Sequence, residues 1–223
     1  METITGKAEG IRLYPPACIG KKIFDSLQTL KYNNVPMTER ERLIEIIRTR
    51  SFQYSDKPIY QLSSGAMSKF YFNMKMAFSS GEAQFLIGKL VFEKVRELKL
   101  NVNAIGGLTM GADPIAYAVA RYSYDFDANN TIQAFVIRKE AKPHGLQLQV
   151  EGNVKVGDNV IIVDDVVTTG TSTIKAINLA RKHGLIVKAV IVLVDRGEQN
   201  GRQSIEALGL PVYDIFTIND FLS

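Results

Sequence analysis

The chemically distinctive part of the sequence is the run 160–172, which reads V-I-I-V-D-D-V-V-T-T-G-T-S. It begins with apolar, β-branched residues, the composition of a strand that is buried on both faces. Two adjacent carboxylates, Asp164 and Asp165, come next, and hydroxyl-bearing residues then surround Gly170. Beyond Ser172 the apolar residues recur at helical spacing. We therefore predict a strand, an acidic turn, a small polar loop and a helix in that order.

A loop of this composition at a helix N-terminus directs backbone N–H groups and hydroxyls to one point, where they bind a phosphate. The neighbouring carboxylates suit a polyhydroxylated or metal-bound partner. An ordinary strand followed by a threonine-rich N-cap is the alternative interpretation, and the acidic pair beside the loop argues against it. The run thus predicts a site for a ribose phosphate.

A second group of side chains is basic. Residues 138–145 read R-K-E-A-K-P-H-G, and four of their side chains are cationic or potentially cationic: Arg138, Lys139, Lys142 and His144. They follow an apolar run and precede a polar, glutamine-containing stretch without clear periodicity at 146–153. We predict a loop that covers a polyphosphate, although a solvated basic turn is the usual meaning of such a cluster.

Two further strand ends carry polar residues. A strand predicted at 102–105 runs into the glycine-containing loop 106–114, and another at 187–194 ends at the sequence 195–197, D-R-G. Adjacent glycines let a backbone approach a ligand closely, although Asp113 also fits plain helix capping. In parallel sheets, ligands bind beyond the carboxyl ends of the strands. Four strand ends with polar residues therefore indicate one shared site.

The elements that must position these residues alternate between strand and helix. Apolar runs and helical periodicity predict strands at 102–105, 132–137, 160–163, 187–194 and 212–216, and helices from near 38, at 80–98, at 115–121, after 172 and at about 203–208. Such alternation gives an α/β fold with a mainly parallel, twisted sheet flanked by helices. Residues 63–75 combine a polar turn with an aromatic strand, for which a hairpin with core aromatics is the simplest interpretation. We expect 1–50 to form an N-terminal helical arm or hood and 51–223 to form the main domain.

Length and composition limit the classes of function. The 223 residues carry 27 basic and 23 acidic side chains, a net charge of +4, which fits a polyanionic small molecule at least as well as nucleic acid. The single cysteine, Cys18, excludes an internal disulfide and favours a reducing compartment. No apolar run reaches the roughly 18 residues that span a membrane, and the N-terminus lacks the order of a secretory signal. We expect a cytoplasmic protein that binds neither membrane nor nucleic acid.

The run 160–172 resembles the signature of the type I phosphoribosyltransferases, which bind phosphoribosyl pyrophosphate (PRPP). From about residue 55 to the C-terminus, the chain is similar to the orotate phosphoribosyltransferases within that family. The segments that carry this second resemblance are 64–73, 106–114, 135–145, 160–172 and 194–196. The string R-K-E-x-K-x-H-G in particular separates these enzymes from the purine phosphoribosyltransferases, and Arg196 supports the same choice.

The resemblance implies the type I phosphoribosyltransferase fold and a reaction of pyrimidine biosynthesis. In that reaction, N1 of orotate attacks C1′ of PRPP and yields orotidine 5′-monophosphate and pyrophosphate. The PRPP-binding residues that the resemblance implies are Arg138, Lys139, Lys142, His144, Asp164, Asp165, Val166, Val167, Thr168, Thr169, Gly170, Thr171 and Ser172. The catalytic residues among them are Lys142, His144, Asp164 and Asp165. The residues implied to contact or pack on orotate are Thr168, Arg196, Tyr71 and Phe72.

The same resemblance implies a partner and a cofactor. The family works as a homodimer in which the loop that carries Lys142 and His144 closes over the neighbouring subunit's site. The implied cofactor is Mg²⁺, which is carried by PRPP and has no direct protein ligand.

Two positions depart from the common form of the family, which implies a thinner set of pyrophosphate contacts. Many members carry a lysine where Ser63 stands and another where Met110 stands, and both lysines normally face the substrates. Two alternatives to orotate transfer remain, namely transfer to a purine base and a non-catalytic regulator that senses PRPP and binds RNA or DNA. The regulator needs a coherent basic face, and the charges of residues 39–50 are mixed.

Overall fold

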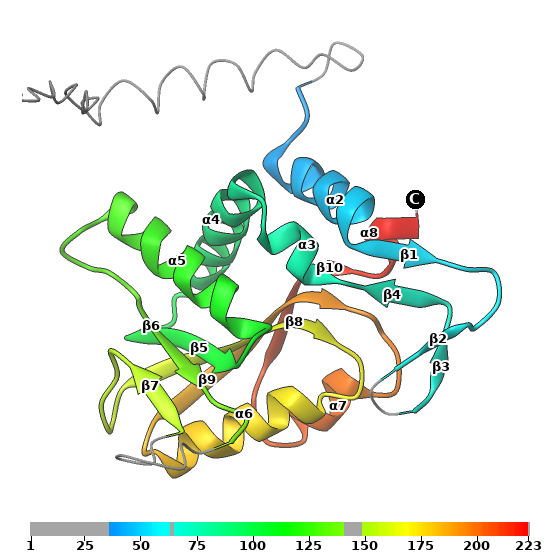
Figure 1. Ribbon diagram of the computed structural model, residues 1–223. Helices are drawn as coiled ribbons and strands as arrows, with labels where there is room; N and C mark the ends of the chain where they lie inside the picture. The colour runs from blue at the N-terminus through cyan, green and yellow to red at the C-terminus, as the bar shows by residue number, and fades with distance from the viewer. Residues whose placement is uncertain (1–35, 63–64, 141–148, 223) are drawn as a thin grey trace, which may run out of the picture. The chain divides into compact units, whose positions relative to one another are not determined.

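A computed structural model describes residues 36–62, 65–140 and 149–222 (Figure 1). In this part of the chain, six strands form a central sheet in the order β10–β9–β8–β5–β6–β7. Their bounds are β5 Ala104–Leu108, β6 Gln133–Ile137, β7 Val150–Gly152, β8 Asn159–Val167, β9 Ile186–Asp195 and β10 Val212–Thr217. All neighbouring strands run parallel except β7, which is antiparallel to β6. The predicted α/β fold with a mainly parallel sheet is confirmed.

Helices cover both faces of this sheet (Figure 1). The helices α4 (Gly81–Glu97) and α5 (Ala112–Phe126) lie on one face, and α6 (Thr171–Lys182) and α7 (Gly201–Glu206) lie on the other. Successive side chains of a strand point to opposite faces: Ile161 and Val163 pack in the core under α4 and α5, whereas Val160 and Ile162 pack in the core over α6. This double burial explains why the strand sequences are continuous apolar runs.

Smaller elements pack beside the sheet. They are α2 Glu39–Arg50, β1 Phe52–Tyr54, β2 Tyr60–Gln61, β3 Met67–Ser68, β4 Phe70–Phe72, α3 Met74–Phe78 and α8 Asn219–Leu222. The predicted hairpin with core aromatics at 63–75 is only partly present: β3 pairs antiparallel with β2, but the aromatic strand β4 pairs antiparallel with the more distant β1. Of its aromatic residues, Phe72 packs against the core and Tyr71 is exposed. No helix in the described part of the chain is long and apolar enough to cross a membrane.

The compact unit that contains the sheet begins at Glu39. Its first helix, α2, buries Leu43 and Ile47 completely, and Arg42 pairs with Glu82 of α4 at 2.7 Å. The domain boundary that we predict at residue 50 stays a prediction, since most of residues 1–38 lie outside the described part of the chain.

The structure corrects several predicted elements. Asp164 and Asp165 lie inside β8 rather than in a turn after it, because the ladder between β8 and β9 continues to the pair Val167 and Asp195. Likewise β5 continues through its two glycines to Leu108, paired with β6. The elements that the sequence patterns did not indicate include β7, within the stretch 146–153, and α3. Helix α5 begins at Ala112 and ends at Phe126, beyond the predicted range 115–121.

The two glycines of β5 serve packing within the sheet rather than the approach of a ligand. A Cβ on Gly106 would lie 2.1 Å from the carbonyl oxygen of Phe135 on β6, and a Cβ on Gly107 would lie 2.3 Å from that of Val163 on β8. Neither distance is compatible with a side chain. The interpretation of these residues as a loop that approaches a ligand is therefore wrong for Gly106 and Gly107.

We expect Gly106→Ala to lower the free energy of unfolding by about 1–3 kcal/mol or more, the usual cost of inserting atoms into a packed core. The control is Gly81→Ala at the first position of α4, where a Cβ would meet no atom within 4 Å and alanine favours the helix. Urea unfolding of the three proteins measures the difference. Equal midpoints for Gly106→Ala and the wild type would contradict this account of β5.

Candidate functional site

The candidate site lies at the carboxyl edge of the parallel strands. Because β5, β6, β8 and β9 are parallel neighbours, the residues that follow them meet at one edge of the sheet. Several contacts join these strand ends. Gly111, after β5, lies so close to β8 that a Cβ on it would be 2.7 Å from Asp165 Oδ1. After β6, the carbonyl of Lys139 accepts a hydrogen bond from Lys175 Nζ of α6 at 2.9 Å. After β9, the N–H of Arg196 donates to the carbonyl of Val167 on β8. The predicted convergence of four strand ends is confirmed.

Asp164 ties the strand β8 to the helix that follows it. Its side chain is buried, and Oδ2 accepts hydrogen bonds from Ser172 Oγ at 2.8 Å and from Thr173 Oγ1 at 2.7 Å. Burial raises the pKa of this carboxyl, and the two hydroxyl donors act in the opposite direction. Asp164 therefore fixes the position of the loop between β8 and α6.

Asp165 is the less enclosed member of the acidic pair. It is half-buried, and its Oδ1 accepts a hydrogen bond from the N–H of Val166 at 2.9 Å. Burial, and then the charge of Asp164, raise the pKa of Asp165 to about 7. A carboxylate in this position attracts a cation or several hydroxyl donors, because either partner favours its charged form.

The loop 168–172 turns the chain from β8 into α6. Gly170 has φ +75° and a Cβ there would lie 2.8 Å from the carbonyl oxygen of Gly201, so the turn requires glycine. The hydroxyls of Thr169 and Thr171 lie 2.9 Å apart, and α6 begins at Thr171. The positive end of the helix dipole thus lies at this loop.

Two of the predicted PRPP-binding residues have side chains that face the cores. Val167 is buried with the core over α6, and Val166 is partly buried against the core under α4 and α5. Their side chains therefore pack within the domain. Thr168 is half-buried, and its carbonyl lies against Gly201 at the start of α7.

The basic stretch after β6 is described only in part. Arg138 Nη1 lies 3.6 Å from Glu151 Oε1 on β7, and Lys139 is exposed. Lys142 and His144 lie outside the described residues, as does Ser63.

Arg196 follows β9 and is only 5% exposed. Its Nη2 donates to Ser68 Oγ at 2.6 Å and to the carbonyl of Phe70 at 3.0 Å, and it lies 2.6 Å from Glu198 Oε2. Burial lowers the pKa of Arg196, and Glu198 acts in the opposite direction. A buried guanidinium at a strand end is a strong candidate for binding a carboxylate.

Tyr71 and Phe72 are neighbours on β4, so their side chains point to opposite sides. Phe72 packs into an aromatic cluster, with ring centroids 4.9 Å from Phe52 and 5.3 Å from Phe221. Tyr71 is exposed and stacks on Tyr60 at 5.7 Å. The structure does not bring the two rings together on one side of β4.

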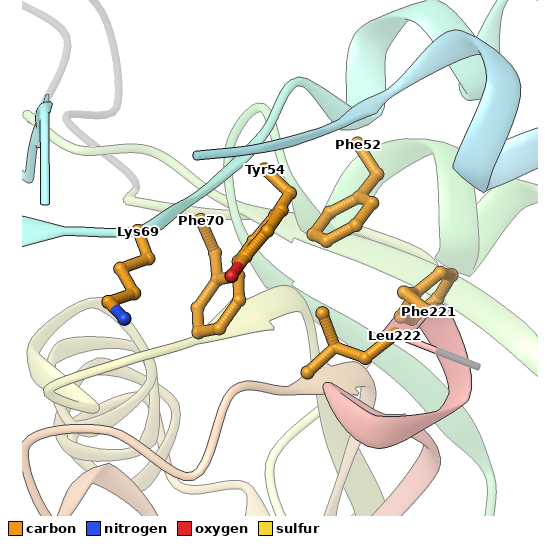
Figure 2. Close-up of a pocket in the computed structure, with 6 residues that line it drawn as sticks. All are labelled: Phe52, Tyr54, Lys69, Phe70, Phe221 and Leu222. Atoms are coloured by element: carbon orange, nitrogen blue, oxygen red, sulfur yellow. The ribbon is translucent and has the colours of Figure 1, made fainter. Parts of the chain in front are cut away.

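A separate cavity of about 420 Å³ lies between β1, β4 and α8 (Figure 2). Figure 2 shows aromatic rings from the two strands facing the end of α8. The residues that line the cavity are Phe52, Tyr54, Lys69, Phe70, Phe221 and Leu222. None of the residues predicted for the site lines this cavity. Within residues 36–62, 65–140 and 149–222, no group of three or more His, Cys, Asp or Glu side chains is arranged to hold a metal ion.

Sequence reasoning missed three residues at this edge. Thr173 holds Asp164, and Ser68 and Glu198 contact Arg196. Ser68 lies 128 positions from Arg196 in the chain, so no local pattern links the two. Glu198 could have been noted as an acidic residue two positions after Arg196, and Thr173 as part of the hydroxyl-rich run.

The chain matches the phosphoribosyl transferase domain family over residues 78–219. It is 45% identical to the orotate phosphoribosyltransferase of Aquifex aeolicus over 186 residues, which are 83% of this chain and 99% of that protein. Two crystal structures of Mycobacterium tuberculosis orotate phosphoribosyltransferase are also similar. The complex with Fe(III) dicitrate has a TM-score of 0.69 at 33% identity and covers 82% of this chain and 99% of that chain. The complex with PRPP has a TM-score of 0.64 at 29% identity, and the match covers 82% of this chain and 91% of that chain.

Proposed function

The chain belongs to the orotate phosphoribosyltransferases, and we propose that the residues at the carboxyl edge of its sheet carry out the reaction of this family. N1 of orotate attacks C1′ of PRPP, pyrophosphate leaves, and orotidine 5′-monophosphate forms. One observation supports this assignment most strongly. The acidic pair, the loop 168–172 and the buried Arg196 all lie at the carboxyl ends of β8 and β9. Positioning and fixed charges drive such a transfer, without a covalent nucleophile.

We assign the 5′-phosphate of PRPP to the loop 168–172 and the ribose to Asp164 and Asp165. The turn at Gly170 and the start of α6 support the first assignment, because a helix N-terminus favours an anion. The charge of the acidic pair supports the second, because the ribose gains positive charge as pyrophosphate leaves. Since Ser172 and Thr173 already hold Asp164, Asp165 is the carboxylate with more freedom to meet the ribose.

The departing pyrophosphate is assigned to Arg138, Lys139, Lys142 and His144, whose positive charge offsets the charge of the leaving group. For Lys142 and His144 the assignment rests on the family resemblance alone. By the same resemblance, their loop closes over the neighbouring subunit's site in a homodimer. Closure would exclude water, which otherwise hydrolyses the donor.

The cytoplasmic location expected from the single cysteine also stays a prediction.

Magnesium enters this proposal as part of the donor substrate. Phosphate and hydroxyl oxygens are the ligands that Mg²⁺ prefers, and PRPP supplies both, so the ion would be bound by the donor rather than by protein side chains. When bound, it neutralises charge on the leaving group. The two carboxylates at the end of β8 would hold the ribose of the donor that carries the ion.

Orotate is assigned to the end of β9. The guanidinium of Arg196 would pair with the orotate carboxylate, and its burial makes such a charged pair stronger than it would be in water. Thr168, at the neighbouring end of β8, would contact both substrates. Of the two aromatic residues proposed for the ring, Tyr71 is the better supported, since Phe72 already packs against Phe52 and Phe221.

Incubation with PRPP, Mg²⁺ and one base at a time tests the choice of acceptor. We expect orotate to give orotidine 5′-monophosphate, identified by its mass, and hypoxanthine and adenine to give no more product than a reaction without base. Turnover of either purine at a rate equal to or above that of orotate would contradict the assignment.

A further inference from the structure

The guanidinium of Arg196 has an acidic partner from its own chain. One nitrogen, Nη2, faces three acceptors: Ser68 Oγ, the carbonyl of Phe70 and Glu198 Oε2, all within 3.0 Å. Ser68 Oγ in turn donates to Glu198 Oε1 at 3.0 Å. Because Nη2 carries two hydrogens, three acceptors exceed what it can satisfy with good geometry.

The pair between Arg196 and Glu198 is incomplete on both sides. Arg196 Nε and Glu198 Oε2 are buried atoms that have no hydrogen-bond partner among the described residues, although Oε2 lies only 2.6 Å from Nη2. A bidentate carboxylate would bond to two guanidinium nitrogens at once. The guanidinium is therefore neutralised by Glu198 but retains a buried donor for a better placed carboxylate.

We propose that Glu198 is the internal counter-ion of Arg196 until the acceptor binds, and that the carboxylate of the acceptor displaces it. The inference rests on the proposed role of Arg196 in binding orotate. Two carboxylates at one guanidinium repel each other, so binding of the acceptor requires Glu198 to withdraw. Its side chain is 27% exposed, and it follows Gly197, whose φ is +63°. Glu198 thus has access to solvent, whereas Arg196 and Ser68 are buried.

This arrangement selects for an anionic acceptor. An acceptor with a carboxylate replaces the charge that Glu198 withdraws, whereas an uncharged base leaves the buried guanidinium without a counter-ion, which is costly. The contact with Glu198 stabilises the free enzyme and is lost in the complex. The free energy by which Glu198 stabilises the free site is therefore subtracted from the binding free energy of the acceptor. Glu198 thus positions Arg196 and contributes to selectivity.

The test is Glu198→Gln, which keeps an oxygen that accepts from Ser68 and removes the charge. We expect the KM for orotate and the Kd for orotidine 5′-monophosphate to fall by about tenfold, in keeping with a hydrogen bond to a charged group. The value of kcat at saturating orotate should stay near that of the wild type, and the Tm of the free enzyme should fall. Glu198→Ala should also lower the KM for orotate and the Kd for orotidine 5′-monophosphate, so the test does not depend on a single variant.

Glu206→Gln is the matched control. Glu206 lies on α7 and pairs with Arg202 at 3.9 Å on the surface, so the same change of charge there should leave the KM for orotate unchanged. An unchanged or raised KM in both Glu198 variants overturns the proposal. Arg196→Lys separates this failure from failure of the proposed function. If that variant also binds orotate normally, the role of Arg196 is wrong, and if it raises the KM, only the counter-ion is wrong.

Discussion

Lys142→Ala is expected to lower kcat by about 10²- to 10³-fold, the typical effect of removing one group that stabilises charge in a transition state. The ammonium group is proposed to neutralise pyrophosphate as it leaves, an interaction that is strongest after the bond to C1′ has stretched. The free energy of unfolding should stay unchanged. Steady-state rates at saturating PRPP and orotate measure the effect, and urea unfolding measures stability.

Lys155→Ala is the control for this loss of charge. Lys155 is exposed in the turn before β8, at the opposite end of that strand from the loop 168–172, and its replacement should leave kcat unchanged. A near-normal kcat for Lys142→Ala would show that the basic loop is wrongly assigned.

Asp165→Asn is expected to lower kcat/KM for PRPP by about 10²-fold or more, because the variant lacks the negative charge that offsets the charge of the ribose. Asp165 is a better choice than Asp164 for testing the role in catalysis. Asp164 also accepts hydrogen bonds from the hydroxyls of Ser172 and Thr173, so its replacement would disturb the structure as well. The control Asp125→Asn changes an exposed residue of α5 that pairs with Arg121 at 3.1 Å. Unimpaired use of PRPP by Asp165→Asn would contradict the proposed binding of ribose.

The same variant has a predicted effect on the pH dependence of stability. The pKa of Asp165 is about 7 in the folded protein and about 3.9 in an unfolded chain. The folded state therefore binds more protons between these values, and the contribution of Asp165 to stability is lost as the pH rises from about 4 to about 7. Relative to the wild type, Asp165→Asn should gain stability over this range. Denaturant unfolding of the variant and the wild type at pH 5 and pH 8 measures this gain, and an equal stability difference at the two pH values would contradict it.

If the loop with Lys142 crosses to the neighbouring site, the two inactive variants should complement each other. A mixed dimer of Lys142→Ala and Asp165→Asn contains one site with both wild-type residues. Equal mixing and random reassociation should restore about a quarter of wild-type activity, from half of the dimers with one of two sites intact. If the mixture stays as inactive as its components, the loop acts within its own subunit or the protein is not a dimer.

Much of the fold follows from local patterns. The continuous apolar runs located the parallel strands correctly, because a strand buried on both faces admits few polar residues. The same criterion failed where a strand continues past its apolar run, as β8 does through Asp164 to Val167. There the hydrogen bonds to β9 hold the backbone extended through the acidic pair. The strand β7 was missed because its edge position removes the need for an apolar sequence.

The site was only partly predictable. The acidic pair and the loop 168–172 share one short run, so their spacing alone indicated a ribose phosphate. The contacts of Arg196 could not be read in this way, since Ser68 and Phe70 come from a distant part of the chain. The neighbouring residues Tyr71 and Phe72 were assigned to the same ring, although alternation along a strand separates their side chains.

A crystal structure of the protein with orotidine 5′-monophosphate tests the central claim most directly, because this product carries the phosphate, the ribose and the carboxylate in one molecule. We predict the 5′-phosphate on the loop 168–172, the ribose hydroxyls at Asp165, and the carboxylate on Arg196 with Glu198 turned away. A nucleotide whose phosphate lies away from that loop, or whose carboxylate makes no contact with Arg196, would contradict the account.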